Sequence, residues 1–188
     1  MDKRTHRCGD VGISDVGREV VVMGWVRTHR DHGRVVFLDL WDHRGIVQVV
    51  ADPQISSQAY GTAQSLRSEF VVVVRGEVRT RPAGTENPAL RTGAVEVAAQ
   101  AIEVLNEARV PPFPIGEGTR VDEGVRSQYR YLDLRQGTMQ RNLRLRHRAV
   151  RAMRGALDAE GFVEVETPML TRSTPEGARD YLVPSRVH

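Results

Sequence analysis

The chain has 188 residues, of which 40% are hydrophobic and 27% charged, enough for one domain with an apolar core or for a small domain and part of a second. No run of about 18 uncharged apolar residues is present, and the opening residues, MDKRTHRCGDVG, lack the apolar segment of a signal peptide. We therefore expect a cytoplasmic protein that does not enter a membrane. The single cysteine, Cys8, excludes an internal disulfide and, with only His6 nearby, a structural zinc site.

Arginine supplies almost all of the positive charge, because Lys3 is the only lysine in the chain. The formal net charge is only +3, while the isoelectric point is near 9.5. The planar guanidinium group suits phosphates and the edges of bases. Arginine clusters also form ordinary solvated faces. The positions of the arginines along the chain therefore decide between a nucleic-acid site and a solvated face.

The first half of the chain is predicted to consist mainly of β-strands. Three stretches rich in β-branched and aromatic residues, 19–29, 35–42 and 46–52, are separated by polar turns. A short helix is expected over 55–66, with Ser56 or Ser57 as its N-cap, and two further strands over 69–81 and 93–105. Five strands with a helix between the third and fourth is the element order of the OB-fold, a barrel that commonly binds single-stranded nucleic acid. Sandwiches and SH3-like barrels share the strands but seldom the helix.

An OB-fold that binds nucleic acid needs aromatic faces for stacking and polar groups for base edges, with arginines between them. Six residues on or beside the predicted strands meet this description: Arg30, Phe37, Gln48, Arg79, Arg81 and Glu96. Arg79 and Arg81 are two apart, so we expect them to project from one face. Three alternatives remain open, namely that Phe37 belongs to the core, that Gln48 simply faces solvent and that Glu96 pairs with one of the arginines.

The second half changes character after residue 105. Residues 106–138 begin with a stretch rich in proline and glycine, which predicts a hinge between domains. A long amphipathic helix is expected over 139–160 and ends at Gly161, followed by a strand over FVEVETP that Pro168 interrupts. The predicted organisation is an OB-fold domain over 1–105, a linker over 106–138 and the start of another domain over 139–188.

Several sequence blocks occur together in an order that resembles one enzyme family. The blocks are GWV…RDHG…FLDL…GIVQVV in the predicted barrel, RYLDLR in the linker, and ETPML followed by TPEGARDYLVPSRV after the long helix. Together they resemble the aspartyl branch of the class II aminoacyl-tRNA synthetases over essentially the whole chain. The resemblance implies a mixed β and α+β fold, in which an OB-fold barrel, a hinge and the motif-one helix and strand lead into a class II catalytic domain.

The resemblance also implies an activity and partners for the full-length enzyme. In this family a homodimer uses ATP and Mg2+ to form aspartyl-adenylate from L-aspartate and then transfers aspartate to tRNA(Asp). Glu176 of the PEGA block would contact the aspartate substrate, and Pro168 would lie at the dimer interface. The residues that hold ATP and Mg2+ in the family have no counterpart within this chain. We therefore expect no catalytic residue, metal or cofactor here, and no activity of the 188 residues alone.

By the same resemblance, the six barrel residues would bind the anticodon. Phe37 would stack on the middle base and Gln48 would read its edge. His32 and Gly84, in two turns near the site, resemble the residues of family members that accept both tRNA(Asp) and tRNA(Asn). Ordinary turn residues are the alternative for both positions.

Two other identities remain open at this stage. One is a stand-alone OB-fold module that binds tRNA or single-stranded nucleic acid, in which the segment after the linker serves only for dimerisation. The other is an asparaginyl or lysyl synthetase of the same architecture. The PEGARDYL block and the short amino terminus disfavour the asparaginyl enzyme, and the lysyl enzyme carries a longer amino-terminal extension. The gene sequence beyond His188 separates these identities.

Overall fold

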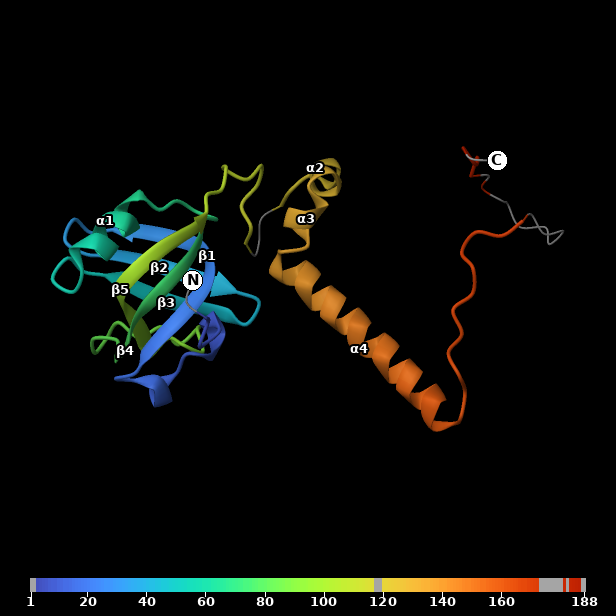
Figure 1. Ribbon diagram of the computed structural model, residues 1–188, viewed down its shortest axis with the longest axis horizontal. Helices are drawn as coiled ribbons and strands as arrows, with labels where there is room; N and C mark the ends of the chain where they lie inside the picture. Colours follow the sequence, from blue (N-terminus) through green and yellow to red (C-terminus); the bar gives the residue numbers. More distant parts are fainter. Residues whose placement is uncertain (1–2, 117–119, 173–180, 182, 187–188) are drawn as a thin grey trace. The chain divides into compact units, whose positions relative to one another are not determined.

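The computed structural model describes residues 3–116, 120–172, 181 and 183–186, and it divides into two compact units, Met1–Pro114 and Ile115–His188. Within the described residues of the first unit, five strands close into a barrel (Figure 1). They are β1 (Glu19–Asp31), β2 (Val36–Asp42), β3 (Gly45–Ala51), β4 (Val71–Thr80) and β5 (Val95–Asn106). The helix α1 (Ser57–Ser65) lies between β3 and β4, which confirms the OB-fold.

The strand order around the barrel is β1-β2-β3-β5-β4. Neighbouring strands are antiparallel, except that β3 and β5 run parallel through Val49 opposite Val97. This parallel contact needs a crossover connection, and α1 with β4 provides it. Ser56 is the N-cap of α1, and its side chain accepts a hydrogen bond from the backbone N–H of Ala59 at 3.2 Å. The order places residues of β1, β2, β3 and β5 side by side on the outer surface.

The core of the barrel is made by alternate residues of the strands. In β2, Val36, Leu38 and Leu40 are fully buried, while Phe37 and Asp39 point to the other face and are partly exposed. Each such buried aliphatic side chain contributes about 1.5–3 kcal/mol to folding. The alternation therefore fixes which side chains of β2 are available to a ligand.

The amino-terminal segment packs onto the barrel through two short 3-10 helices, η1 (Cys8–Asp10) and η2 (Ile13–Asp15). Cys8 is fully buried in the core. Burial raises the pKa of its thiol, and the neighbouring carboxylate of Asp42 raises it further. Cys8 is therefore an unreactive packing residue.

The second unit contains α2 (Glu123–Gln128), α3 (Arg130–Asp133) and the long helix α4 (Gly137–Ala159). Gly161 follows α4 with φ of +84°, a left-handed conformation that ends the helix as expected. The prediction of a strand over FVEVETP is wrong, because residues 162–168 form no regular element. A strand needs a neighbour to accept its backbone hydrogen bonds, and the described residues offer none to this segment.

Candidate nucleic-acid interface

A groove of about 440 Å³ lies on the outer surface of the barrel. Its walls come from β1, the turn after it, β2, β3, the loop between β4 and β5, and β5 itself. The residues that line it are Arg30, His32, Val35, Phe37, Gln48, Val50, Pro82, Thr85 and Glu96. Four of the six residues predicted to bind nucleic acid therefore lie together, and two, Arg79 and Arg81, do not line the groove.

A line of polar side chains runs across the floor of the groove. The Arg30 Nη2 group donates to Asp39 Oδ1 at 3.0 Å and to Gln48 Oε1 at 3.4 Å. On its other side, Gln48 donates from Nε2 to Glu96 Oε2 at 2.9 Å. The Gln48 side chain therefore connects an arginine on β1 to a carboxylate on β5.

This network settles two of the open alternatives. Gln48 is only 9% exposed, so it does not simply face solvent. The carboxylate of Glu96 bonds to Gln48, although Glu96 stands opposite Arg79 in the β4–β5 register. An amide has two N–H groups and a carbonyl oxygen with two lone pairs. Gln48 thus keeps one donor and one acceptor site beyond these bonds.

Phe37 lies at the groove and outside the hydrophobic core. Its ring meets that of His32 nearly at right angles, with the ring centroids 5.5 Å apart. Such an edge-to-face contact is a favourable aromatic geometry. The two rings therefore form a single aromatic wall beside the polar floor.

Arg79 and Arg81 differ in their surroundings. The Arg79 side chain is about half exposed and forms an ion pair with Glu77 at 3.8 Å. Arg81 is only 8% exposed, and its Nε donates to the backbone carbonyl of Val95 at 3.1 Å. The spacing of Arg79 and Arg81 predicted that both guanidinium groups are exposed on one face. This prediction is wrong, because only the Arg79 side chain is exposed.

The loop between β4 and β5 forms one wall of the groove through Pro82 and Thr85. Gly84 lies between them with φ of +84°, and its backbone N–H donates to Glu86 Oε2 at 2.8 Å. At the far end of the loop, the buried Thr92 hydroxyl donates to the Ile46 carbonyl at 2.6 Å. These two hydrogen bonds stabilise the observed conformation of the loop.

The sequence analysis missed several residues of this site. Pro82, Thr85, Val35 and Val50 line the groove but carry no polar pattern that would single them out. Asp39 was also missed, although its alternation with Phe37 places both on the same face of β2. The alternation of residues along this strand could therefore have identified Asp39 from the sequence.

Two predicted residues fall in the second unit. Glu176 lies outside the described residues. Pro168 is exposed in a segment without regular structure. In the described part of the chain, no group of three His, Cys, Asp or Glu side chains lies close enough to hold a metal ion. There is likewise no helix among the described residues that is long and apolar enough to cross a membrane.

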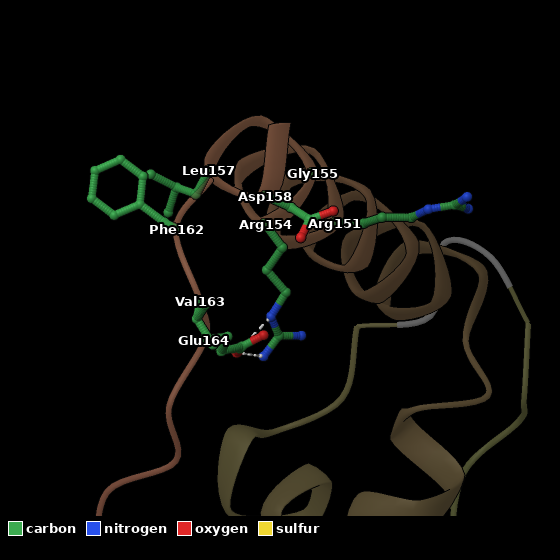
Figure 2. A pocket seen from close by; sticks show the side chains of 8 residues that line it. All are labelled: Arg151, Arg154, Gly155, Leu157, Asp158, Phe162, Val163 and Glu164. Carbon is green, nitrogen blue, oxygen red and sulfur yellow. Dashed lines mark hydrogen bonds and ion pairs between the residues drawn. The ribbon is translucent and has the colours of Figure 1, made fainter. Parts of the chain in front are cut away.

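A hollow of about 550 Å³ lies at the end of α4 (Figure 2). Leu157, Phe162 and Val163 contribute apolar surface to it. Arg154 points toward Glu164, and their closest ion-pair distance is 2.7 Å. Both of these side chains are more than 60% exposed, so this ion pair contributes little to stability.

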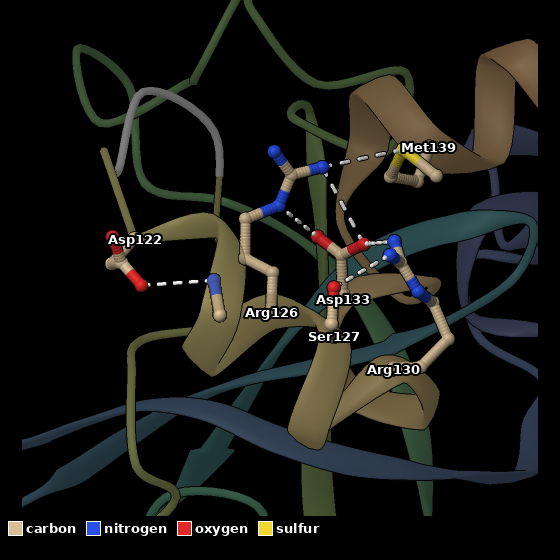
Figure 3. A network of polar contacts seen from close by, with 7 residues as sticks. Asp122, Arg126, Ser127, Arg130, Asp133 and Met139 are labelled. Atoms are coloured by element: carbon tan, nitrogen blue, oxygen red, sulfur yellow. Dashed lines mark hydrogen bonds and ion pairs between the residues drawn. The ribbon is translucent and has the colours of Figure 1, made fainter.

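A compact ionic network joins α2 to α3 (Figure 3). The carboxylate of Asp133, which has no solvent exposure, accepts from Arg126 Nε at 2.7 Å and from Arg130 Nη1 at 2.5 Å. The hydrogen bond from Arg126 is the largest of the effects that lower the pKa of Asp133 below its ordinary value. Asp133 and Arg130 belong to the RYLDLR block and Arg126 to the helix α2 before it, so the block has a structural role here.

Comparison with known proteins identifies the family of both units. A model of an OB-fold nucleic acid binding domain matches residues 20–105, and a model of the class II tRNA synthetases (D, K and N) matches residues 122–188. The chain belongs to the class II tRNA synthetases. It corresponds to an amino-terminal part of such an enzyme and contains the anticodon-binding type of OB-fold.

Curated members of the family match nearly the whole chain. The aspartate–tRNA(Asp/Asn) ligase of Thermosynechococcus vestitus is 60% identical over 98% of this chain and 31% of its own length. Those of Moorella thermoacetica and Syntrophomonas wolfei are 58% and 56% identical, over 98% and 99% of this chain and 30% and 32% of their own lengths. The chain thus spans about a third of the length of the curated relatives that it matches.

Solved synthetases share the structure. The asparaginyl-tRNA synthetase of Pyrococcus horikoshii, complexed with asparaginyl-adenylate, has a TM-score of 0.74 at 27% identity, covering 90% of this chain and 37% of its own. The aspartyl tRNA synthetase of Entamoeba histolytica has a TM-score of 0.79 at 21% identity, covering 90% of this chain and 40% of its own. The second similarity shows the fold alone.

Proposed function

We propose that this chain binds the anticodon of tRNA(Asp) and tRNA(Asn) for an aspartate–tRNA ligase. The full-length enzyme would use ATP to form aspartyl-adenylate and transfer L-aspartate to both tRNAs as a homodimer. The observation that carries the proposal is the groove, in which an aromatic ring, an amide and a guanidinium group converge. The high identity to ligases named for both tRNAs supports the choice of substrates.

The chemical step belongs to other parts of the enzyme. The contribution that we assign to the barrel is recognition: it would hold the tRNA by its anticodon loop while the 3′ end is charged elsewhere in the enzyme.

The groove suits an unpaired uracil, the middle base of both anticodons. The ring of Phe37 offers a stacking surface, which accepts any base. The remaining donor and acceptor sites of Gln48 match the adjacent carbonyl and N3–H groups of uracil, whereas cytosine offers an acceptor at N3 and a donor amine. Stacking would thus supply affinity, and the amide would supply the choice of base.

The acceptance of both tRNAs would depend on the walls of the groove. The two anticodons differ only in the base that follows the shared pair, cytosine in one and uracil in the other. His32 lies in the wall and can donate or accept a hydrogen bond according to its tautomer. Gly84 adds no side chain between Pro82 and Thr85, so it leaves room for either pyrimidine.

The proposal is tested by titrating the 188-residue chain with fluorescent anticodon stem–loops. We expect the tRNA(Asp) and tRNA(Asn) stem–loops to bind within about threefold of each other. Replacing the middle uracil with cytosine should weaken binding by roughly 5- to 150-fold, the equivalent of about 1–3 kcal/mol for a mismatched edge. A stand-alone module without anticodon preference would bind all three stem–loops equally, and that result would refute the proposal.

A further inference from the structure

A carboxylate that does not line the groove and was not predicted as a site residue bonds to a residue that does line it. Asp39 stands directly opposite Gln48 in the β2–β3 register and accepts the hydrogen bond of Arg30 at 3.0 Å. The Asp39 side chain is 20% exposed and that of Arg30 is 44% exposed. Arg30 is therefore the more exposed partner, and the Asp39 carboxylate holds its guanidinium group over the strand.

The position of Arg30 controls the orientation of the Gln48 amide. In the observed orientation, the amide oxygen faces the Arg30 guanidinium and the amide nitrogen faces the Glu96 carboxylate. A flipped amide would place its N–H groups against the guanidinium and its oxygen against the carboxylate, and both contacts would be repulsive. Two charges of opposite sign thus select one of the two orientations.

The orientation matters because the two ends of an amide carry opposite hydrogen-bonding roles. The observed orientation presents its free donor on the Glu96 side and its free acceptor on the Arg30 side. A flipped amide would exchange these positions and would match a different base edge. The choice of base therefore depends on whichever groups hold the guanidinium in place.

We propose that Asp39 is a positioning residue of this groove: it holds Arg30 beside the Gln48 carbonyl and thereby fixes which base edge the groove accepts. This inference rests on the proposed function, since it assigns a further residue to the same site. Asp39 does not contact the base itself. Its effect reaches the base through Arg30 and Gln48.

The test compares Asp39→Ala with Asp10→Ala in the full 188-residue chain. Asp10 forms a similar carboxylate–arginine pair with Arg44 at 3.2 Å, but neither residue lines the groove. Each variant is titrated with the tRNA(Asp) stem–loop and with the stem–loop that carries cytosine at the middle position. The thermal midpoint of each variant is measured in parallel.

We expect Asp39→Ala to reduce the preference for uracil over cytosine at least fivefold, with binding of the uracil stem–loop most affected. Asp39→Glu should restore part of the preference, and Asp10→Ala should leave it unchanged. The side-chain amide resonances of Gln48 in a 15N-labelled chain should shift in Asp39→Ala and not in Asp10→Ala. These resonances report the positioning directly, which a general loss of stability would not.

Two outcomes separate failure of this inference from failure of the proposed function. If the unaltered chain shows no preference for uracil, the proposed function fails. If that preference exists and Asp39→Ala keeps it, or weakens both stem–loops equally while lowering the thermal midpoint, then Asp39 has only a structural role and the inference is overturned.

Discussion

Truncation of Phe37 should separate RNA affinity from the stability of the barrel. The side chain lies on the outer face of β2, between the fully buried Val36 and Leu38, and is absent from the hydrophobic core. Its ring contact with His32 is worth roughly 0.5–1.5 kcal/mol to the folded state. Phe37→Ala should therefore cost about 1 kcal/mol of folding free energy and leave the core intact.

The loss in RNA binding should be larger. Stacking of one base on an aromatic side chain contributes about 1–3 kcal/mol. At about 1.4 kcal/mol for each factor of ten, Phe37→Ala should raise Kd roughly 5- to 150-fold. Because stacking accepts every base, the stem–loops with uracil and cytosine should lose affinity by the same factor.

Val36→Ala provides the matched control on the same strand. It removes two buried methyl groups from the core and should cost roughly 2 kcal/mol of folding free energy without touching the groove. Fluorescence titration and thermal unfolding of both variants give the comparison. Unchanged RNA affinity in Phe37→Ala, or an equal loss of affinity in Val36→Ala, would refute the assignment of Phe37 to stacking.

Two further predictions concern the second unit and the walls of the groove. Because the Asp133 pKa is lowered in the folded state, its stabilisation of α2 and α3 is present above the ordinary aspartate pKa of about 3.9 and is lost as pH falls through the lowered value. The amide NMR shifts of residues 123–135 should follow this loss of stabilisation. The Asp133→Asn variant should show no such pH dependence. In the full-length enzyme, His32→Leu combined with Gly84→Lys should slow aspartylation of tRNA(Asn) more than that of tRNA(Asp). Gly84→Asn is the control for backbone strain, because asparagine tolerates the positive φ of this position. Equal slowing of the reaction with both tRNAs would contradict the prediction.

Local patterns were sufficient to predict the elements of the barrel. The β-branched runs, the polar turns and the Ser56 cap each act over a few residues, so the strands and α1 could be placed from the sequence. The strand predicted over 162–168 depended on a pairing partner, which no local pattern supplies. Its alternation of Val163, Val165 and polar residues was real, but alternation alone does not make a strand.

The interior of the site was harder to predict because its contacts join distant parts of the chain. Gln48 and Glu96 are 48 residues apart and meet only because β3 lies beside β5 in the barrel. Arg81 is buried where its spacing from Arg79 suggested exposure, because the loop that follows β4 returns to the barrel and Arg81 bonds to Val95. Residue type indicated the binding face, whereas the pairing within it required the strand order.

Under the proposed function, the preformed network would allow one small groove to separate affinity from specificity. The polar groups of Gln48 are already bonded on both sides in the free protein, so a ligand does not have to reorganise them. Under the proposed function, a correct base would bond to the remaining donor and acceptor sites, while a wrong base would leave a largely buried polar group unpaired, at a cost of about 1–3 kcal/mol. The Phe37 ring carries no such penalty, since any base can stack on it. Changes at Phe37 should therefore shift the affinity for all RNAs together, and changes at Gln48 or at the charges that orient it should shift the ratio between them.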